Sequence, residues 1–457
     1  MSKRKLIILI IIILAIVLVI FGISFLSKPN PSTVSGQTGT NFFSNFFPFG
    51  RSTQTKQEPT SSTNISGFQP NETSPVIENW LIKVSSFPTA GYGLFMKERF
   101  TEMPTIIPNP SNLPLSGEAT TTSPLDKGDL GGSKILPNPT PPTIEFIPTV
   151  RYVERANGNI YQTSADKIEE RKITTTIIPK VYDAYFSNKG NFVSMRHLKN
   201  DGKTIETFAG SLPVEILGGD TANLSDIKGT FLPEGIIDIS VAPDSSKVLY
   251  LFNFKDNAIG MTVDAITGQK TQVLNSPFTE WLSWWPNSRM ITVTSKPSAN
   301  SPGYMYAIDP DKKDFNKILG NINGLTTLTS PSGKLVLYAN NNLSLSVFDI
   351  DTGSSNSLNI KTLPEKCVWN NTSEIIYCSV PRSATGNGYP DTWYQGEVSF
   401  SDDIWKVNLT NQNTLMVADL SIGGEEIDGI KLALDETETY LFFVNKKDSY
   451  LWKFNLK

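Results

Sequence analysis

The two cysteines are the residues of this chain with the clearest potential chemistry. Cys367 and Cys378 flank a short segment of turn-forming residues centred between Thr372 and Ser373. If the segment is a hairpin loop of two or four residues, the cysteines face each other across adjacent strands, within disulfide range. An oxidising compartment would favour the bond. We predict a disulfide, and two buried free thiols are the alternative. We expect no metal site at the cysteines, because no partner ligands are visible.

The aromatic residues of segment 381–403 are the best candidates for a binding site. This segment carries Arg382, Tyr389, Trp393 and Tyr394 among glycines and prolines. Rigid rings on a loop give contact area at low entropic cost, so the composition suits recognition. In the alternative arrangement Trp393 and Tyr394 fold back and cap the domain. We name these four side chains as a candidate binding site, and we name no residue as catalytic.

The remaining motifs indicate structure rather than chemistry. Asp309, Asp311 and Asp314 resemble a calcium loop, but the glycine and distal glutamate of an EF-hand are missing, so turn chemistry explains them. The single histidine, His197, lies in an alternating strand pattern and leaves little room for histidine-based metal sites or triads. The chain contains neither a Gly-x-Ser-x-Gly nucleophile elbow nor a phosphate-binding glycine loop. We therefore expect no metal and no cofactor.

Charge and composition narrow the function classes further. The 40 Lys and Arg residues nearly balance the 44 Asp and Glu residues, so the formal net charge is −4. A nucleic-acid-binding protein would normally show a basic excess, and we expect no nucleic-acid partner. The aromatic content of 10% suits a β-rich fold.

A β-strand pattern recurs from residue 180 onward. Each unit has an apolar strand, a turn rich in Pro, Asn, Asp, Ser or Gly, a second apolar strand, and then a third and a fourth strand. Successive first turns are roughly 40 to 65 residues apart, which fits four-stranded propeller blades with loop insertions. These turns occupy residues 187–190, 243–246, 286–288, 331–333, 370–372 and 435–437.

The units resemble the WD-repeat-like propeller repeats of the TolB type. The signature of that family is an apolar strand, then Ser-Pro-Asp-Gly, then a β-branched or aromatic strand. Residues 330–335 (Ser-Pro-Ser-Gly-Lys-Leu) and 242–247 (Ala-Pro-Asp-Ser-Ser-Lys) match it best. The resemblance covers residues 180–457, with a weaker extension back to residue 78. It implies a β-propeller and usually a binding or scaffolding role, without implying one ligand.

We predict an all-β propeller of seven four-stranded blades over residues 76–457; six or eight blades also fit the pattern. The final unit ends after three strands, and residues 80–84 are expected to supply the fourth, which would close the ring and remove an exposed edge. A long disordered insertion is expected at residues 101–143, which contain many prolines. The strands expected for the first blade lie at residues 88–95, 149–154, 158–162 and 169–176.

An apolar run near the N-terminus predicts a membrane helix. Residues 6–26 are apolar except for a glycine and a serine, and at about 1.5 Å per residue they reach roughly 30 Å, the thickness of the hydrocarbon core. Lys3, Arg4 and Lys5 precede the run, so the tip 1–5 should be cytoplasmic and the rest extracytoplasmic. A cleaved signal peptide is the alternative, but its apolar region is usually shorter and a small-x-small cleavage site is missing.

A flexible tether should follow the helix. Residues 27–75 are rich in Ser, Thr, Asn, Pro and Gly and contain little that could form a core. Within them, residues 42–49 hold five phenylalanines. These rings either lie at the membrane interface or form a docking peptide for another protein.

These features favour a single-pass cell-membrane protein whose propeller is a binding or scaffold module for an unknown protein or envelope component. Membrane lipid around residues 6–26 is the other expected partner. The alternative is an extracytoplasmic enzyme acting on glycans or peptides through carboxylates in the channel. Two or three channel-facing carboxylates would favour the enzyme, and an apolar channel would favour binding. A third hypothesis is a membrane-bound sensor subunit.

Overall fold

The structure, a computed structural model, describes residues 80–101, 143–213, 225–384, 386, 388–421 and 424–456. The expected membrane helix, the tether and nearly all of the expected insertion lie outside these ranges. No helix within them is long and apolar enough to cross a membrane.

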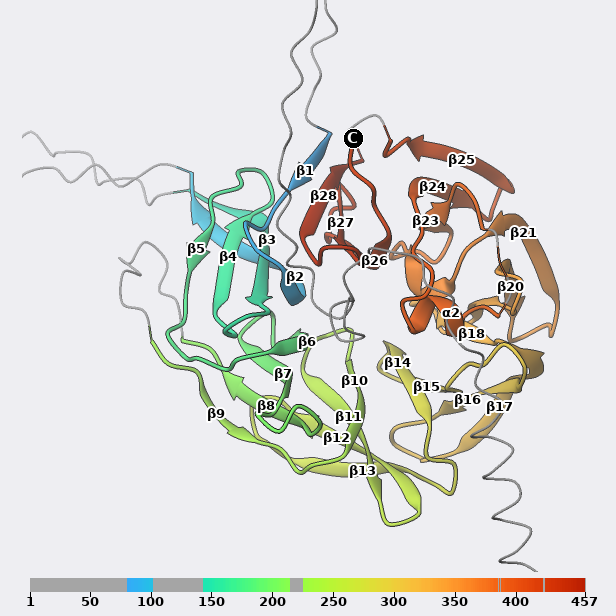
Figure 1. Ribbon diagram of the computed structural model, residues 1–457, viewed down its shortest axis with the longest axis horizontal. Coiled ribbons are helices and arrows are strands. Elements are labelled where there is room, and N and C mark those ends of the chain that lie inside the picture. The colour runs from blue at the N-terminus through green and yellow to red at the C-terminus, as the bar shows by residue number, and fades with distance from the viewer. Residues whose placement is uncertain are drawn as a thin grey trace, which may run out of the picture. The chain divides into compact units, whose positions relative to one another are not determined.

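Seven four-stranded antiparallel sheets surround a central axis as the blades of a propeller (Figure 1). This confirms the expected all-β, seven-bladed fold. The first three blades consist of β2 (Thr89–Phe100), β3 (Ile144–Glu154), β4 (Ile160–Ser164) and β5 (Arg171–Lys172); β6 (Val181–Ser187), β7 (Phe192–Leu198), β8 (Ile205–Ser211) and β9 (Lys228–Phe231); and β10 (Ile236–Val241), β11 (Lys247–Phe254), β12 (Asn257–Asp264) and β13 (Lys270–Ser276). The next three consist of β14 (Trp281–Asn287), β15 (Met290–Ser295), β16 (Pro302–Ile308) and β17 (Phe315–Asn323); β18 (Thr326–Thr329), β19 (Leu335–Ala339), β20 (Ser344–Asp349) and β21 (Ser355–Lys361); and β22 (Cys367–Trp369), β23 (Ile375–Pro381), β24 (Asp402–Asn408) and β25 (Asn413–Ala418).

The seventh blade joins the two ends of the described chain. It consists of β26 (Gly429–Leu434), β27 (Tyr440–Asn445), β28 (Leu451–Asn455) and, as its outer strand, β1 (Leu81–Lys83). Leu81 of β1 pairs with Phe454 of β28. Beyond the strand, the Val84 N–H donates to the Leu451 carbonyl oxygen at 2.8 Å, and the ring of Trp80 meets that of Phe454 edge-on at 5.5 Å. The strand expected at residues 80–84 therefore closes the ring.

Local sequence sets the hairpin turns inside the blades. Between β18 and β19 the chain turns at Gly333, whose N–H donates to the Ser330 carbonyl oxygen at 2.9 Å. The φ angle of Gly333 is 72°, a left-handed conformation that glycine adopts without steric cost. The Ser-Pro-Ser-Gly motif at 330–333 thus marks the first turn of the fifth blade, as its spacing predicted.

The apolar core is divided among the contacts between neighbouring blades. One cluster joins Val153 and Ile160 of the first blade to Val181 and Met195 of the second. Further clusters join each following pair of blades around the ring, back to the seventh and first. Each blade is therefore stabilised by burial against two neighbours, and no single central core exists among the described residues.

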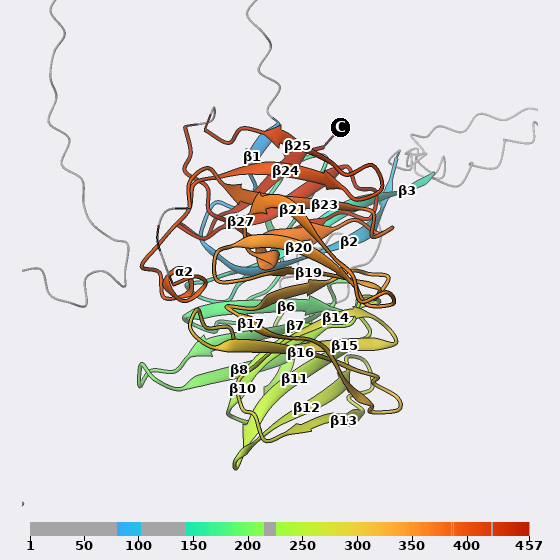
Figure 2. The same cartoon turned by 90° about the vertical axis from the view of Figure 1, so that its right-hand side faces the viewer.

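One face of the ring carries most of the functional candidates. Because strands alternate in direction from the inner to the outer edge of a blade, the connections between blades share a face with the loops between second and third strands; we call it the loop face. It holds the 3₁₀ helix η3 (Pro364–Lys366) and the short helix α2 (Asp391–Tyr394). The tip of the β2–β3 hairpin, where Phe100 pairs with Ile144, lies on the opposite face (Figure 2).

Closure by β1 makes a prediction about truncated chains. A chain that starts at residue 76 keeps β1, and we expect it to be soluble and folded. A chain that starts at residue 86 exposes the edge of β28 and loses the contacts of Trp80, so its unfolding free energy should fall by about 2–4 kcal/mol. Urea unfolding followed by far-UV circular dichroism measures the difference, and equal midpoints would show that the ring does not depend on this strand.

Candidate functional site

The central channel contains a cavity of about 520 Å³. Inner strands of all seven blades line it, together with Glu365 of η3. Its wall combines apolar and aromatic side chains with hydroxyl groups and three charged groups, which belong to Asp238, Glu365 and Lys431. This volume and this mixture of groups are typical of small-molecule sites.

An ion pair spans the loop-face end of the channel. Lys431 of β26 reaches past the first blade, where its Nζ donates to the Ala90 carbonyl oxygen at 3.0 Å, and contacts Asp183 of β6 at 2.5 Å. A break in the β26–β27 register gives Lys431 a φ of 52°. The guanidinium of Arg196 lies 3.7 Å from the same carboxylate. The charge of Asp183 is therefore matched by two cations.

Asp238 of β10 has hydrogen-bond donors but no ion-pair partner in the described chain. Its Oδ2 accepts from the Ser283 N–H and from the Ser283 hydroxyl at 2.8 Å, which links the third blade to the fourth. Burial raises the pKa of Asp238 to about 6, although these hydrogen bonds and the charge of Arg196 act in the opposite direction.

Glu365 enters the channel from the connection between the fifth and sixth blades. The hydroxyl of Tyr394 donates to its Oε1. Burial raises the pKa of Glu365 to about 7, and the nearby carboxylate of Asp238 adds to this, whereas the Tyr394 hydrogen bond and the charges of Lys366 and Lys446 oppose it. Two carboxyl groups with pKa values near neutrality thus share one cavity.

A fully buried lysine fixes the loop face beside the channel. The Nζ of Lys366 pairs with Asp402 of β24 at 2.8 Å and with Asp428, just before β26; all three side chains are inaccessible to solvent. Burial raises the pKa of Asp402 to about 6, opposed by the Lys366 charge. Burial also acts to raise the pKa of Asp428, but Lys366 and several hydrogen-bond donors hold it below its usual value. The cluster joins the sixth blade to the seventh.

Two of the four sequence-predicted binding residues lie in the interior. Tyr389 and Trp393 are each 3% exposed and pack with Phe400, which corresponds to the folded-back arrangement considered for Trp393. The indole Nε1 of Trp393 donates to the Asp428 carboxylate at 3.0 Å. These two aromatic side chains therefore hold residues 388–400 against the propeller.

The other two predicted residues remain partly exposed. Tyr394 is 37% exposed, and its hydroxyl contacts Glu365 at the channel. Arg382 donates from Nε to Asp403 at 3.0 Å and lies 3.5 Å from Asp419. Of these two residues, Tyr394 contacts a side chain that lines the channel, whereas Arg382 belongs to an ion-pair network at the start of the loop.

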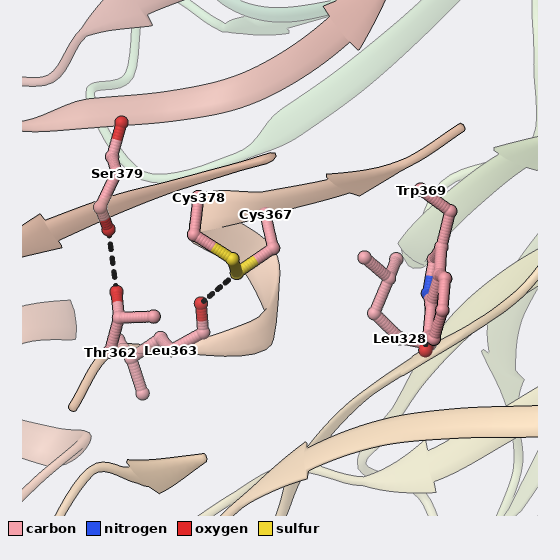
Figure 3. The surroundings of a disulfide bond; sticks show 7 residues. All are labelled: Leu328, Thr362, Leu363, Cys367, Trp369, Cys378 and Ser379. Carbon is pink, nitrogen blue, oxygen red and sulfur yellow. Dashed lines mark hydrogen bonds between the residues drawn. A yellow bond between two sulfur atoms is a disulfide. The ribbon is translucent and has the colours of Figure 1, made fainter. Parts of the chain in front are cut away.

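Cys367 and Cys378 form a disulfide in the structure, with an S–S distance of 2.11 Å (Figure 3). They are directly opposed in the β22–β23 register, and both are buried in the core between the fifth and sixth blades. Nearby, the indole of Trp369 donates to the Leu328 carbonyl oxygen at 3.1 Å. The bond anchors the short strand β22 to its neighbour, and Cys367 also lines the channel cavity.

The motifs judged to be structural occupy structural positions. Asp309 accepts from the N–H groups of Asp311 and Lys312 at 3.0 and 2.9 Å, as in an ordinary Asx turn. His197 lies 3.4 Å from Glu206 on the neighbouring strand. In the described ranges, no group of three or more His, Cys, Asp and Glu side chains is arranged to hold a metal ion.

Sequence reasoning missed the channel residues themselves. Asp238, Glu365 and Lys431 lie in the short inner strands or just before them, where single charged residues look like loop or surface positions. One weak signal was present: Asp402 and Asp403 form an acidic pair directly before the apolar residues Ile404 and Trp405 of β24, and buried carboxylates need a cation or hydrogen-bond donors. The cation, Lys366, directly precedes Cys367.

Comparisons with known proteins do not identify a family or a function for this chain. No family model matches the chain, and no curated protein matches its sequence. Among solved structures it is similar to an oligogalacturonate lyase from Vibrio parahaemolyticus, with 9% identity and a TM-score of 0.47 over 68% of this chain and 86% of that one. It is also similar to an oligogalacturonate lyase in complex with manganese, with 12% identity and a TM-score of 0.45 over 68% of this chain and 85% of that one. For TolB from Acinetobacter baumannii the identity is 13% and the TM-score 0.38, over 57% of this chain and 59% of that one. Membership of the TolB-type repeat family therefore stays a prediction.

The buried lysine predicts a large loss of stability on its removal. Lys366→Met leaves Asp402 and Asp428 buried without their cation, so we expect the unfolding free energy to fall by about 3–5 kcal/mol. Urea unfolding measures the change. Lys296→Met is the matched control, because Lys296 pairs with Glu280 at 2.8 Å on the exposed surface and should change little. Equal losses of unfolding free energy in the two variants would contradict the role of Lys366 as the buried partner of both carboxylates.

The disulfide predicts a specific linked peptide. Protein produced in an oxidising compartment should yield a Cys367–Cys378 cross-link in a non-reducing digest, because the two residues are opposed on adjacent strands. Mass spectrometry before and after reduction and alkylation detects it. Full alkylation of both thiols without prior reduction would show instead that the cysteines remain free.

Proposed function

We propose that this chain is a membrane-anchored, extracytoplasmic β-propeller that acts as a binding or scaffold module for a protein or envelope component. The observation that carries the proposal is the channel cavity of about 520 Å³, lined by all seven blades. Binding requires a shaped cavity with apolar area and a few fixed polar groups. Trp284, Leu282 and Tyr185 supply the apolar area, and Asp238 and Glu365 supply polar groups.

The extracytoplasmic placement is supported by two independent features. The apolar run at residues 6–26, preceded by Lys3, Arg4 and Lys5, has the length and charge asymmetry of an anchor with a cytoplasmic N-terminus. The disulfide between Cys367 and Cys378 favours an oxidising compartment, since such bonds are rare in the cytoplasm. Both features are consistent with a propeller on the extracytoplasmic side of the membrane.

An enzyme with a carboxylate-based site in the channel is the second candidate. The channel is not purely apolar, and the pKa values of Asp238 and Glu365, about 6 and 7, suit proton transfer near neutral pH. We rank binding first because it needs only the cavity and its lining, whereas catalysis also needs carboxyls set on either side of a reacting bond. An intact peptide or glycan recovered after prolonged incubation with the protein favours binding, and turnover lost in Glu365→Gln favours the enzyme.

Photo-crosslinking from inside the channel tests the proposal. Position 284 lines the cavity and is 45% exposed. A photoactivatable phenylalanine analogue placed there in the full chain should form adducts with the bound partner in spheroplasts. The same analogue at position 415, on the outer strand β25 and 56% exposed, should form few. Leu282→Trp narrows the cavity and should reduce adducts at position 284 at least tenfold, as judged by quantitative mass spectrometry.

Three results would contradict the proposed function. Equal adduct yields at positions 284 and 415, or adducts unaffected by Leu282→Trp, would argue against channel binding. Protease added outside the same spheroplasts should degrade the propeller, since the ring is proposed to face outward. Protection of the ring would place it on the cytoplasmic side.

A further inference from the structure

The cations at the loop-face end of the channel gather around one of its three carboxylates. Asp183, Asp238 and Glu365 lie there, and Lys431 and Arg196 contact Asp183 at 2.5 and 3.7 Å. The charge of Arg155 also acts on Asp183. Within the described residues, neither Asp238 nor Glu365 forms an ion pair. Their ionised forms are therefore underpaired in a cavity that offers less water than the surface.

The lysines closest to Glu365 are committed elsewhere. The ammonium group of Lys366 is enclosed by Asp402 and Asp428. The ammonium group of Lys446 donates to the Trp393 carbonyl oxygen and lies 4.2 Å from the centre of that indole ring. Neither lysine contacts Glu365, so no cation of the described residues forms an ion pair with its carboxylate, although the charges of both lysines act on it from a distance.

Aromatic side chains on the same wall suit a cation as well. Trp284 lines the cavity, keeps 45% of its surface exposed, and is fixed by a hydrogen bond from Nε1 to the Thr329 carbonyl oxygen at 3.0 Å. Tyr185 already lies 5.8 Å from the Nζ of Lys431, so one cation of the chain uses a ring of this wall. Indole and phenol rings attract ammonium and guanidinium groups.

A buried hydroxyl on the same cavity wall also lacks a partner. Thr326 of β18 lines the cavity and is 3% exposed, yet its Oγ1 makes no hydrogen bond within the described chain. A buried hydroxyl without a partner costs free energy, and a ligand donor such as an N–H group would satisfy it. This hydroxyl is independent of the two carboxylates and points to an occupant of the same cavity.

We propose that the loop-face end of the channel binds an organic cation, a primary ammonium or guanidinium group, with Asp238 and Glu365 as its anionic partners and Trp284 beside it. This inference rests on the proposed binding function and specifies its ligand chemistry. The two carboxylates come from the third blade and from the connection before the sixth blade, so an extended ligand fits the site better than a small ion. The side chain of a lysine or arginine in a peptide and a free amine both carry this chemistry.

Calorimetric titration of the full chain in detergent micelles tests the inference. The probes are cadaverine, as a free diamine, and the capped tripeptide N-acetyl-Gly-Lys-Gly-amide. Both should bind at pH 8, and the same tripeptide with an acetylated lysine should not, because it has lost its charge. Tighter binding of the tripeptide identifies a peptide as the source of the cation, and tighter binding of cadaverine identifies a free amine.

Charge-removing variants locate the site. Glu365→Gln and Asp238→Asn should each weaken binding at least tenfold at pH 8. Asp351→Asn is the matched control, since Asp351 lies in an exposed turn between the third and fourth strands, away from the loop face, where it pairs with Lys334 at 3.2 Å. Thermal unfolding verifies folding, and neither channel variant should be less stable than the parent, because each removes a poorly solvated charge.

The pH dependence provides a readout that a purely structural role would not move. The pKa values of Asp238 and Glu365 are about 6 and 7, so lowering the pH from 8 to 5 neutralises both carboxyls while the ligand amine stays charged. Affinity should fall at least tenfold over this interval in the parent protein. It should fall much less in the Asp238→Asn, Glu365→Gln double variant.

Absence of binding by both cations at pH 8, or unchanged affinity in both single variants, would overturn the inference. Binding of an uncharged trisaccharide such as maltotriose, lost in Leu282→Trp while the cations fail to bind, would also overturn it and would leave channel binding intact. The proposed function itself fails only on the crosslinking or protease results, so the two failures are distinguishable.

Discussion

The pairing of β1 with β28 is the constraint on which the rest of the structure depends. In a ring of blades, each sheet buries its faces against two neighbours, and the ring exists only if the last blade contacts the first. Here the last blade takes its outer strand from the beginning of the domain. That short strand holds the two ends of the circle together and covers an edge that would otherwise remain unpaired. Because the ring of blades is closed, the inner strands of all seven blades face one axis and together line the channel cavity.

Much of this fold was predictable because its determinants are local. Turn residues such as Gly333, with a left-handed backbone, recur at blade-like spacing, and apolar alternation marks the strands between them. Closure followed from counting, since the last unit lacked one strand. Outer strands were harder to place: β5 contains only Arg171 and Lys172, and β9 is exposed throughout. Without a buried face, a strand leaves little pattern in the sequence.

The site was less predictable because its parts meet only after the ring closes. The aromatic loop at 381–403 has the composition of a recognition surface, yet Trp393 is buried beside Phe400 and donates to Asp428, which directly precedes the next blade. Glu365 belongs to a short linker segment, and nothing in its neighbours indicates that it faces a channel. The distinction between a solvated carboxylate and a buried one depends on contacts between blades, which periodicity within one blade does not encode.

The ionised form of the channel carboxyls, which the proposed cation would require, is also the form that weakens the fold. Their folded-state pKa values, about 6 for Asp238 and 7 for Glu365, exceed the ordinary values of 3.8 and 4.5. Folding therefore favours their protonated forms: this contribution to stability is complete below about pH 4 and is lost as the pH rises through 6 to 7. At neutral pH the ionised forms of these carboxyls therefore weaken the fold. The proposed cation would lower both pKa values and offset this loss, so that cation binding and the stability of the fold would be thermodynamically linked.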